Sequence, residues 1–134
     1  MKKIASAVLG LFFIGCAISS NAQISADALE NSSWILVSIS CENLNLEKMP
    51  ALRFLEKRAS GFNGVNSFSA NYKLSNAQII FSDMISTRMA SLSPALSKLE
   101  TDFTNALLQA SSFELKNDIL TIRGANNTLV FKRI

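Results

Sequence analysis

Hydrophobic and polar residues alternate along much of the chain, which is the pattern expected for half-buried β-strands. In the stretch 67–74, every second residue from Phe68 to Leu74 is apolar, so these side chains share one face of an extended strand. Trp34 begins a similar run that is rich in β-branched residues. The strands predicted in this first part of the chain are 34–40, 51–55, 58–62, 67–74 and 78–81.

One stretch, 94–110, instead repeats its apolar residues at steps of three and four, which predicts an amphipathic helix. Ser93 is suited to cap it, and Pro94 suits the first helical position because its missing N–H would have no partner there. The apolar stripe consists of Leu96, Leu99, Phe103, Leu107 and Ala110. A helix lying on a membrane surface is the alternative, but the polar face is not basic, which disfavours it.

Alternation returns at 113–116, 120–123 and 129–132, and turn-forming residues at 117–118 and 124–127 separate these three runs. The pattern predicts an antiparallel meander with one apolar face. A series of strands, one helix and further strands indicates an α+β fold rather than a parallel α/β fold.

The N-terminus has the features of a secretory signal. Lys2 and Lys3 precede the apolar stretch 4–13, and small residues lead up to Ala22, so we expect cleavage before Gln23. The apolar stretch is shorter than the roughly 20 residues of a transmembrane helix, and no membrane span is expected in the mature protein. The alternative is a lipobox ending at Cys16, although its first position holds phenylalanine where leucine is usual.

These features predict a signal peptide at 1–22, a flexible lead-in at 23–31 and one domain at 32–134. The expected location is the periplasm or the extracellular medium, with a lipid anchor on Cys16 as the alternative. Loss of the two signal lysines lowers the formal net charge from +3 to +1, so the charge gives no argument for nucleic-acid binding.

The amino-acid composition excludes most of the common kinds of catalytic site. The sequence contains no histidine, so it lacks the commonest general base and the commonest metal ligand. The carboxylates are scattered, and no phosphate-binding or calcium-binding motif is present. We therefore expect no enzymatic activity, no cofactor and no metal. Cys41 would be the one cysteine of the mature chain, and we expect it to be a small buried residue, with an intermolecular thiol as the alternative.

Two segments are more specific than ordinary loops. In the first, Gly61, Asn63, Gly64 and Asn66 suit a bend or bulge fixed by side-chain hydrogen bonds, with a ligand-contacting loop as the alternative. The second segment contains Thr87, Arg88 and Met89. Arg88 is either a binding cation or the partner of a carboxylate such as Asp83. Met89, like Met84, is expected to fill the core, and Trp34 to anchor the core rather than to hold a ligand.

The order of these segments resembles the META domain, or HslJ-like, family. The resemblance covers 31–133 and rests on the Trp34 strand, on Ser-Gly-Phe-Asn-Gly-Val-Asn-Ser-Phe-Ser-Ala-Asn-Tyr at 60–72, and on Ser-Thr-Arg-Met-Ala-Ser at 86–91. Val65 and Ser91 stand where many family members carry cysteines, which implies that this chain lacks a bridge between these positions.

The resemblance implies a curved antiparallel sheet that forms a partial barrel, with one helix packed on it. It also implies a non-enzymatic envelope or secreted protein of undefined molecular activity, in a family associated with heat shock, stress tolerance and secretion. The expected partner is either an unknown protein, docked by an envelope lipoprotein, or a small apolar ligand held between sheet and helix. We expect the protein to be a monomer.

Overall fold

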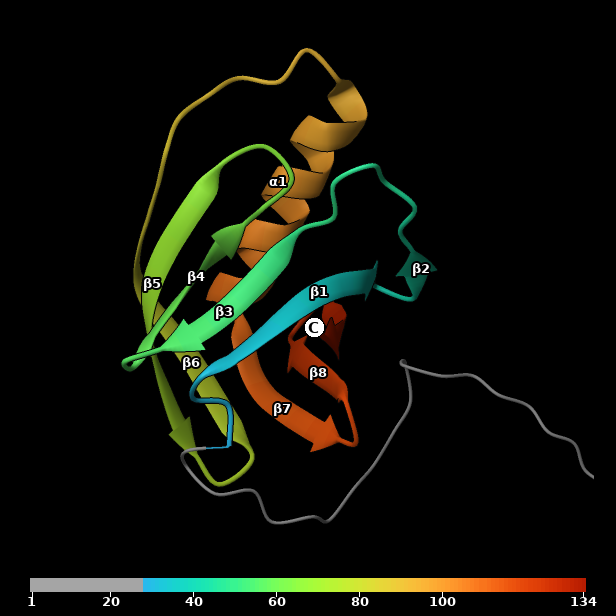
Figure 1. Cartoon of the computed structure of the whole chain (residues 1–134). Coiled ribbons are helices and arrows are strands. Elements are labelled where there is room, and N and C mark those ends of the chain that lie inside the picture. The colour runs from blue at the N-terminus through green and yellow to red at the C-terminus, as the bar shows by residue number, and fades with distance from the viewer. Residues whose placement is uncertain (1–27) are drawn as a thin grey trace, which may run out of the picture.

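The computed structural model describes residues 28–134, which form nine strands and one helix (Figure 1). The predicted signal peptide and Cys16 lie outside the described residues. In chain order the elements are β1 (Ser32–Ile39), β2 (Glu42–Asn43), β3 (Ala51–Leu55), β4 (Arg58–Phe62), β5 (Ser67–Ser75), β6 (Gln78–Ser86), α1 (Pro94–Leu108), β7 (Ala110–Lys116), β8 (Ile119–Gly124) and β9 (Thr128–Arg133). The predicted order of strands, helix and further strands is confirmed.

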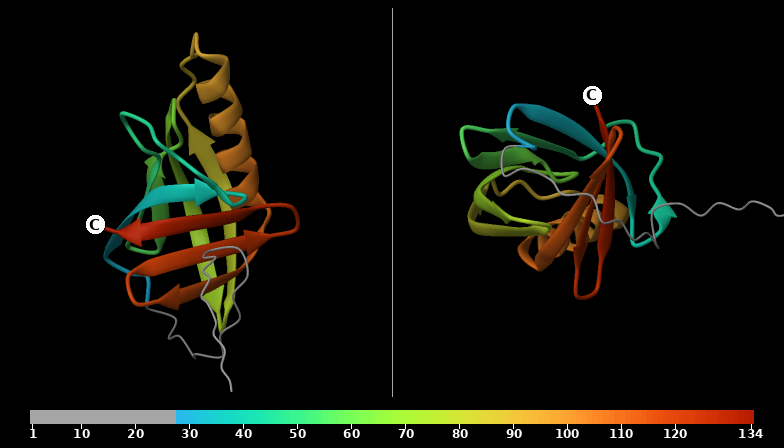
Figure 2. Two further views of the ribbon diagram at one scale, coloured as in Figure 1. Left: turned by 90° about the vertical axis from the view of Figure 1, so that its right-hand side faces the viewer. Right: turned by 90° about the horizontal axis from the view of Figure 1, so that it is seen from below.

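The strands form a closed antiparallel barrel rather than the expected partial one. Sheet neighbours run β2-β1-β3-β4-β5-β6-β7-β8-β9, and β1 also pairs with β9, which joins the two sides of the sheet (Figure 2). β1 achieves this because one edge of the strand pairs Trp34 with Leu52 of β3 while the other pairs Leu36 with Phe131 of β9. The α+β class is correct, but the closure depends on a pairing between the two ends of the domain.

The barrel has its fewest paired residues between β6 and β7. The two strands share one residue pair, Gln78 with Ser112, whereas β6 pairs with β5 along most of its length. The register of β5 and β6 shifts between Ser69 and Asn71, and Asp83 on β6 has a positive φ of 53°. Beyond Gln78, therefore, β6 presents one edge without a strand partner in the described part of the chain.

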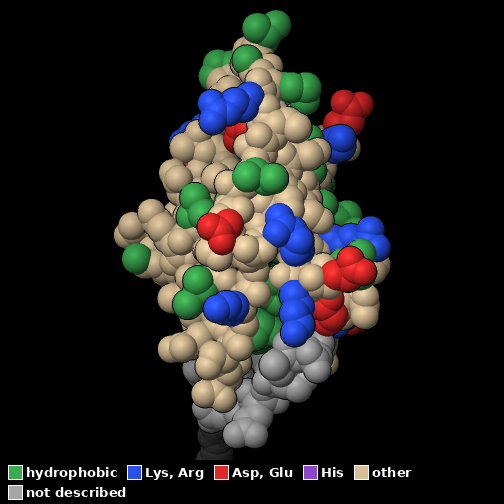
Figure 3. All heavy atoms as spheres, turned by 90° about the vertical axis from the view of Figure 1, so that its left-hand side faces the viewer, with side chains coloured by type: hydrophobic (Ala, Val, Ile, Leu, Met, Phe, Trp, Pro, Cys, Tyr) green, Lys and Arg blue, Asp and Glu red, His purple; other side chains and the backbone are tan. Residues whose placement is uncertain are grey.

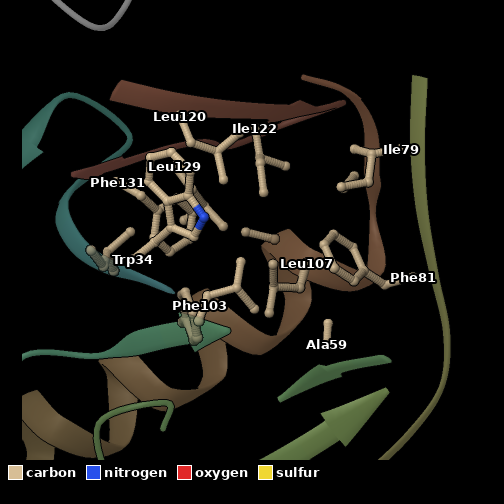
Figure 4. Close-up of a cluster of buried hydrophobic side chains, with 14 of the residues drawn as sticks. Trp34, Ala59, Ile79, Phe81, Phe103, Leu107, Leu120, Ile122, Leu129 and Phe131 are labelled. Atoms are coloured by element: carbon tan, nitrogen blue, oxygen red, sulfur yellow. The ribbon is translucent and has the colours of Figure 1, made fainter. Parts of the chain in front are cut away.

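The helix completes the core. α1 passes behind β3 and β4 in Figure 1 and contacts β6, β8 and β9. Its Phe103 is fully buried, with its ring centroid 5.9 Å from that of Phe68 and 6.1 Å from that of Phe131. Figure 4 shows Phe103 and Leu107 directed from the helix towards side chains of the opposite strands. The barrel interior is thus packed with side chains from both sheet and helix.

The ends of the helix differ slightly from the prediction. Ser93 caps it as expected, since Leu96 N donates a hydrogen bond of 3.3 Å to Ser93 Oγ. The helix ends at Leu108, and Ala110 already belongs to β7. Within residues 28–134, no helix combines the length and the hydropathy needed to cross a bilayer.

The domain begins before residue 32. Leu29, in the expected lead-in, is fully buried in the core, and Asn31 N donates a 2.8 Å hydrogen bond to Phe54 O. Trp34 is a core anchor, as predicted: it is fully buried, and its Nε1 donates a 2.7 Å hydrogen bond to Ser32 Oγ. The last residues of the expected lead-in are therefore part of the folded domain.

Candidate functional site

The loop between β4 and β5 is held by its own side chains. Asn63 Oδ1 accepts hydrogen bonds from Val65 N at 3.0 Å and from Asn66 N at 2.7 Å, and Asn63 N donates to Asn66 O at 2.9 Å. Gly64 has a φ of +108°, a conformation that strongly favours glycine, and it packs against Leu99 of the helix. The loop is rigid and closely packed, as the bend interpretation predicts.

Asn66 connects this loop to two other segments, and we call Asn66, Thr87, Met89 and Glu100 the Asn66 network. Asn66 Oδ1 accepts hydrogen bonds from Met89 N at 2.7 Å and from Thr87 Oγ1 at 2.9 Å. Its Nδ2 donates to Met89 O at 3.1 Å and to a carboxylate oxygen of Glu100 on α1. Asn66 is 3% exposed, so one buried amide joins the loop, the β6–α1 connection and the helix.

The two other residues of the second segment behave differently from Thr87. Met89 is 62% exposed, so the expectation that it fills the core is wrong: its backbone is held by Asn66 and its side chain faces solvent. Met84 does pack against the core. Arg88 is exposed and forms no ion pair among the residues described, while Asp83 accepts a 3.0 Å hydrogen bond from Asn71 instead.

Gly61 has a packing role at the β3–β4 contact. It pairs with Leu52, and a Cβ atom placed on it would lie 1.9 Å from the backbone oxygen of Ala51. Gly61, Asn63, Gly64, Asn66 and Thr87 therefore serve the architecture of the loop region. Their contacts hold neighbouring backbone segments together, which is a structural role.

Cys41 is not the buried residue that we expected. It is exposed in the turn that follows β1 and has a φ of +71°. The preceding Ser40 also has a positive φ, of 51°, and two successive residues of this kind form the tight turn between antiparallel strands. The turn, rather than the core, therefore determines where Cys41 lies.

Three of the described carboxylates, those of Asp102, Glu114 and Asp118, form ion pairs. Glu114 on β7 is 8% exposed, and its Oε1 lies 3.5 Å from Arg123 Nη1 on β8. Asp118 pairs with Arg133 at 3.1 Å. Across residues 28–134, no group of three or more histidine, cysteine, aspartate or glutamate side chains is arranged to hold a metal ion.

Sequence reasoning missed two surface features, both on β6. The first is the part of β6 beyond Gln78, which has no strand partner among the described residues on its β7 side, contacts α1, and carries Ile80, 57% exposed, and Ile85, 66% exposed. A shallow apolar groove of about 320 Å³ adjoins Ile85 and reaches Phe68. The second is a polar cavity of about 600 Å³ that includes Asp83. The consecutive Ile79-Ile80-Phe81 was the available signal, because a strand with one buried face does not need two adjacent isoleucines.

The fold is a closed antiparallel barrel packed by one helix, and the Asn66 network fixes one of its loops. These features place the chain among the small β-barrel domains. The META domain model matches residues 27–134, and the chain belongs to the META domain family.

Individual relatives agree with this assignment. The chain is 28% identical over 134 residues to heat shock protein HslJ of Escherichia coli (strain K12), covering 98% of this chain and 96% of that protein. One NMR structure has a TM-score of 0.69 and 28% identity, over 81% of this chain and 94% of that one. An NMR structure of a protein from Burkholderia xenovorans, with a TM-score of 0.68 and 19% identity over 94% and 99% of the two chains, shares the fold.

The resemblance to cysteine-bearing relatives leads to a testable change. Val65 lies in the rigid loop, and Ser91 lies in the connection that Asn66 holds beside it, where its Oγ accepts a 3.1 Å hydrogen bond from Ser93 N. The double variant V65C/S91C is expected to form a disulfide and to raise the free energy of unfolding by about 2 kcal/mol under oxidising conditions. Denaturant unfolding with and without reductant, together with thiol counting, measures the effect. Two free thiols and an unchanged midpoint would show that these positions are not adjacent.

Proposed function

We propose that this chain is a non-enzymatic cell-envelope or secreted protein that binds an extended segment of another protein along the free edge of β6. The observation that carries the proposal is the pairing of β6, whose ladder with β7 consists of the single pair Gln78 and Ser112. A free edge presents backbone N–H and C=O groups that an added strand satisfies. The protein itself is then a monomeric docking module.

The surroundings of the edge suggest the chemistry of the segment. Ile80 and Ile85 are exposed on β6, and an apolar groove lies beside Ile85 over the pairing of β5 with β6. The strand carries a single charged residue, Asp83. A mostly apolar segment without acidic residues therefore fits this edge best, because alternate side chains supply the specificity of strand addition.

The alternative, a carrier of a small apolar ligand, is less well supported. Trp34, Phe103 and Phe131 are fully buried and occupy the interior between sheet and helix (Figure 4). A ligand in this place would have to displace well-packed aromatic side chains, which costs several kcal/mol.

A role in stress tolerance follows from the docking proposal. The heat-shock name of the relative supports this role, and the predicted signal peptide supports an envelope location. Heat exposes extended apolar segments of other envelope proteins, and such segments are the partners that a free β-edge recognises.

The test is site-specific photo-crosslinking in cells. A photoreactive residue at Ile80 is expected to give heat-dependent crosslinks to extended apolar segments of other envelope proteins, identified by mass spectrometry. The substitution Ile85→Lys should reduce them at least about five-fold, because a charge would enter the apolar groove. The matched substitution Ile119→Lys, at an exposed position of β8, should leave them unchanged. Crosslinks that are equal in both variants, or that join two copies of this chain, would overturn the proposal.

A further inference from the structure

The polar cavity lies at the corner where β4 begins and the β5–β6 hairpin extends past it. Its volume is about 600 Å³, which is within the range of small-molecule sites. Its charged lining residues are Glu30, Lys57, Lys73 and Asp83. Figure 3 shows one face of the molecule, where Lys and Arg side chains are interspersed with Asp and Glu. The cavity therefore contains equal numbers of carboxylates and ammonium groups.

The two carboxylates are held in place by neighbouring groups. Glu30 Oε1 accepts a 2.6 Å hydrogen bond from Tyr72 Oη, and both Glu30 oxygens accept from Lys57 N at 3.2 Å. The hydrogen bond from Tyr72 lowers the pKa of Glu30, so this carboxylate is charged at neutral pH. Asp83 Oδ2 accepts a 3.0 Å hydrogen bond from Asn71 Nδ2.

A chain of hydrogen bonds fixes the amide that holds Asp83. Asn71 Oδ1 accepts a 2.6 Å hydrogen bond from Arg58 Nη1, and Arg58 Nη2 donates to Ser69 Oγ at 2.6 Å. Arg58 thus orients Asn71, and Asn71 orients Asp83. The two lysines differ from the two carboxylates in this respect. Lys57 and Lys73 are exposed, and neither forms an ion pair with a described carboxylate within 4.0 Å.

The backbone at this corner is unusual. Asp83 has a φ of +53° at the point where the β5–β6 register shifts, whereas the φ of +64° at Lys57 belongs, with that of +54° at Glu56, to the two-residue turn between β3 and β4. Left-handed backbone in residues other than glycine costs free energy, and it gathers at sites where a side chain must be directed to a particular place. A β-bulge redirects side chains in the same way. Asp83, at this bulge, contributes its carboxylate to the cavity.

We propose that this cavity binds a small zwitterion with a free ammonium and a free carboxylate group, the class that contains amino acids and short peptides. Glu30 and Asp83 receive the ammonium group, and Lys57 and Lys73 receive the carboxylate. A simple anion would be repelled by the two carboxylates, and a simple cation by the two lysines. A neutral sugar would lack an aromatic platform, because Tyr72 is only 9% exposed.

The proposal is tested by isothermal titration calorimetry on the purified mature chain with uncapped trialanine. Asp83→Asn and Lys73→Gln are each expected to weaken binding at least about ten-fold, because each removes one charge-assisted contact. Asparagine tolerates the left-handed backbone of position 83, so the variant should fold. The matched controls are Asp102→Asn on α1 and Lys116→Gln on β7, which remove charges outside the cavity and should leave the affinity unchanged.

Ligand variants separate the zwitterion from other chemistry. N-acetyl-trialanine amide has the same side chains without either charge, and it should bind at least about ten-fold more weakly than trialanine. Maltose should not bind. The proposal is overturned if trialanine gives no binding at millimolar concentration, if the capped peptide or maltose binds as well, or if the cavity variants behave like the controls. Crosslinking at position 80 and the Ile85→Lys variant test the β6 edge separately, because neither residue lines this cavity.

Discussion

Replacing Gly61 with alanine is expected to destabilise the domain by about 4 kcal/mol or more, one of the largest effects of any single methyl group in this chain. The added Cβ would lie 1.9 Å from the backbone oxygen of Ala51 and 2.8 Å from its carbonyl carbon. Both atoms belong to the backbone of β3, so no side-chain rotation relieves the overlap. The strands β3 and β4 would have to separate where Leu52 now pairs with Gly61.

Denaturant unfolding followed by circular dichroism measures this loss. Ser60→Ala is the matched control, since Ser60 is the preceding residue of β4 and pairs with Arg53 in the same ladder. It should change the free energy of unfolding by less than about 0.5 kcal/mol. A G61A protein within about 1 kcal/mol of the parent would mean that β3 and β4 do not approach as closely as the structure shows.

Local patterns predicted most of the elements, because alternation and helical spacing are properties of short segments. β3 and β4 have the predicted bounds, and α1 differs from the prediction by two residues at its end. β6 was predicted to end at Phe81 but continues to Ser86, because Ser82 and Asp83 interrupt the apolar pattern at the bulge. A bulge changes which face a side chain occupies, and period-two reasoning does not anticipate it.

Closure of the barrel was not predictable in the same way. It depends on β1 pairing with β9, between residues such as Ile35 and Lys132 that lie almost a whole domain apart in sequence. No local signal specifies such a partner. The unpaired edge of β6 has the same origin, because β7 begins only at Ala110, directly after α1, and pairs with β6 at Gln78.

The candidate site shows a similar division. The loop residues Asn63 and Gly64 behave as turn chemistry predicts, since they act on neighbouring residues. The partners of the Asn66 side chain are 21 to 34 residues away, and only the fold brings them together. Met89 and Cys41 were expected in the core because their side chains are apolar, but both are exposed. A hydrogen bond to the backbone of Met89 and the turn geometry at Cys41 decide their positions.

Replacing Asn66 with aspartate is expected to destabilise the domain by about 3 kcal/mol at neutral pH. The new carboxylate keeps the acceptor for Met89 N and Thr87 Oγ1 but replaces the Nδ2 donor with an oxygen. That oxygen would face Met89 O and the carboxylate of Glu100, so a buried donor contact becomes a repulsion between acceptors. Chemical unfolding at neutral pH measures the loss, and Asn45→Asp in the exposed β2–β3 connection controls for the added charge.

A second substitution distinguishes this mechanism from general damage to the loop. In the double variant N66D/E100Q, the glutamine amide donates to the carboxylate introduced at position 66, so about 1.5 kcal/mol of the loss should be recovered. Full recovery is not expected, because the contact with Met89 O stays repulsive. E100Q alone should be close to neutral, since the glutamine oxygen still accepts from Asn66. Additive effects of the two substitutions would contradict a direct contact between residues 66 and 100. The helix would then not be linked to the loop through this contact.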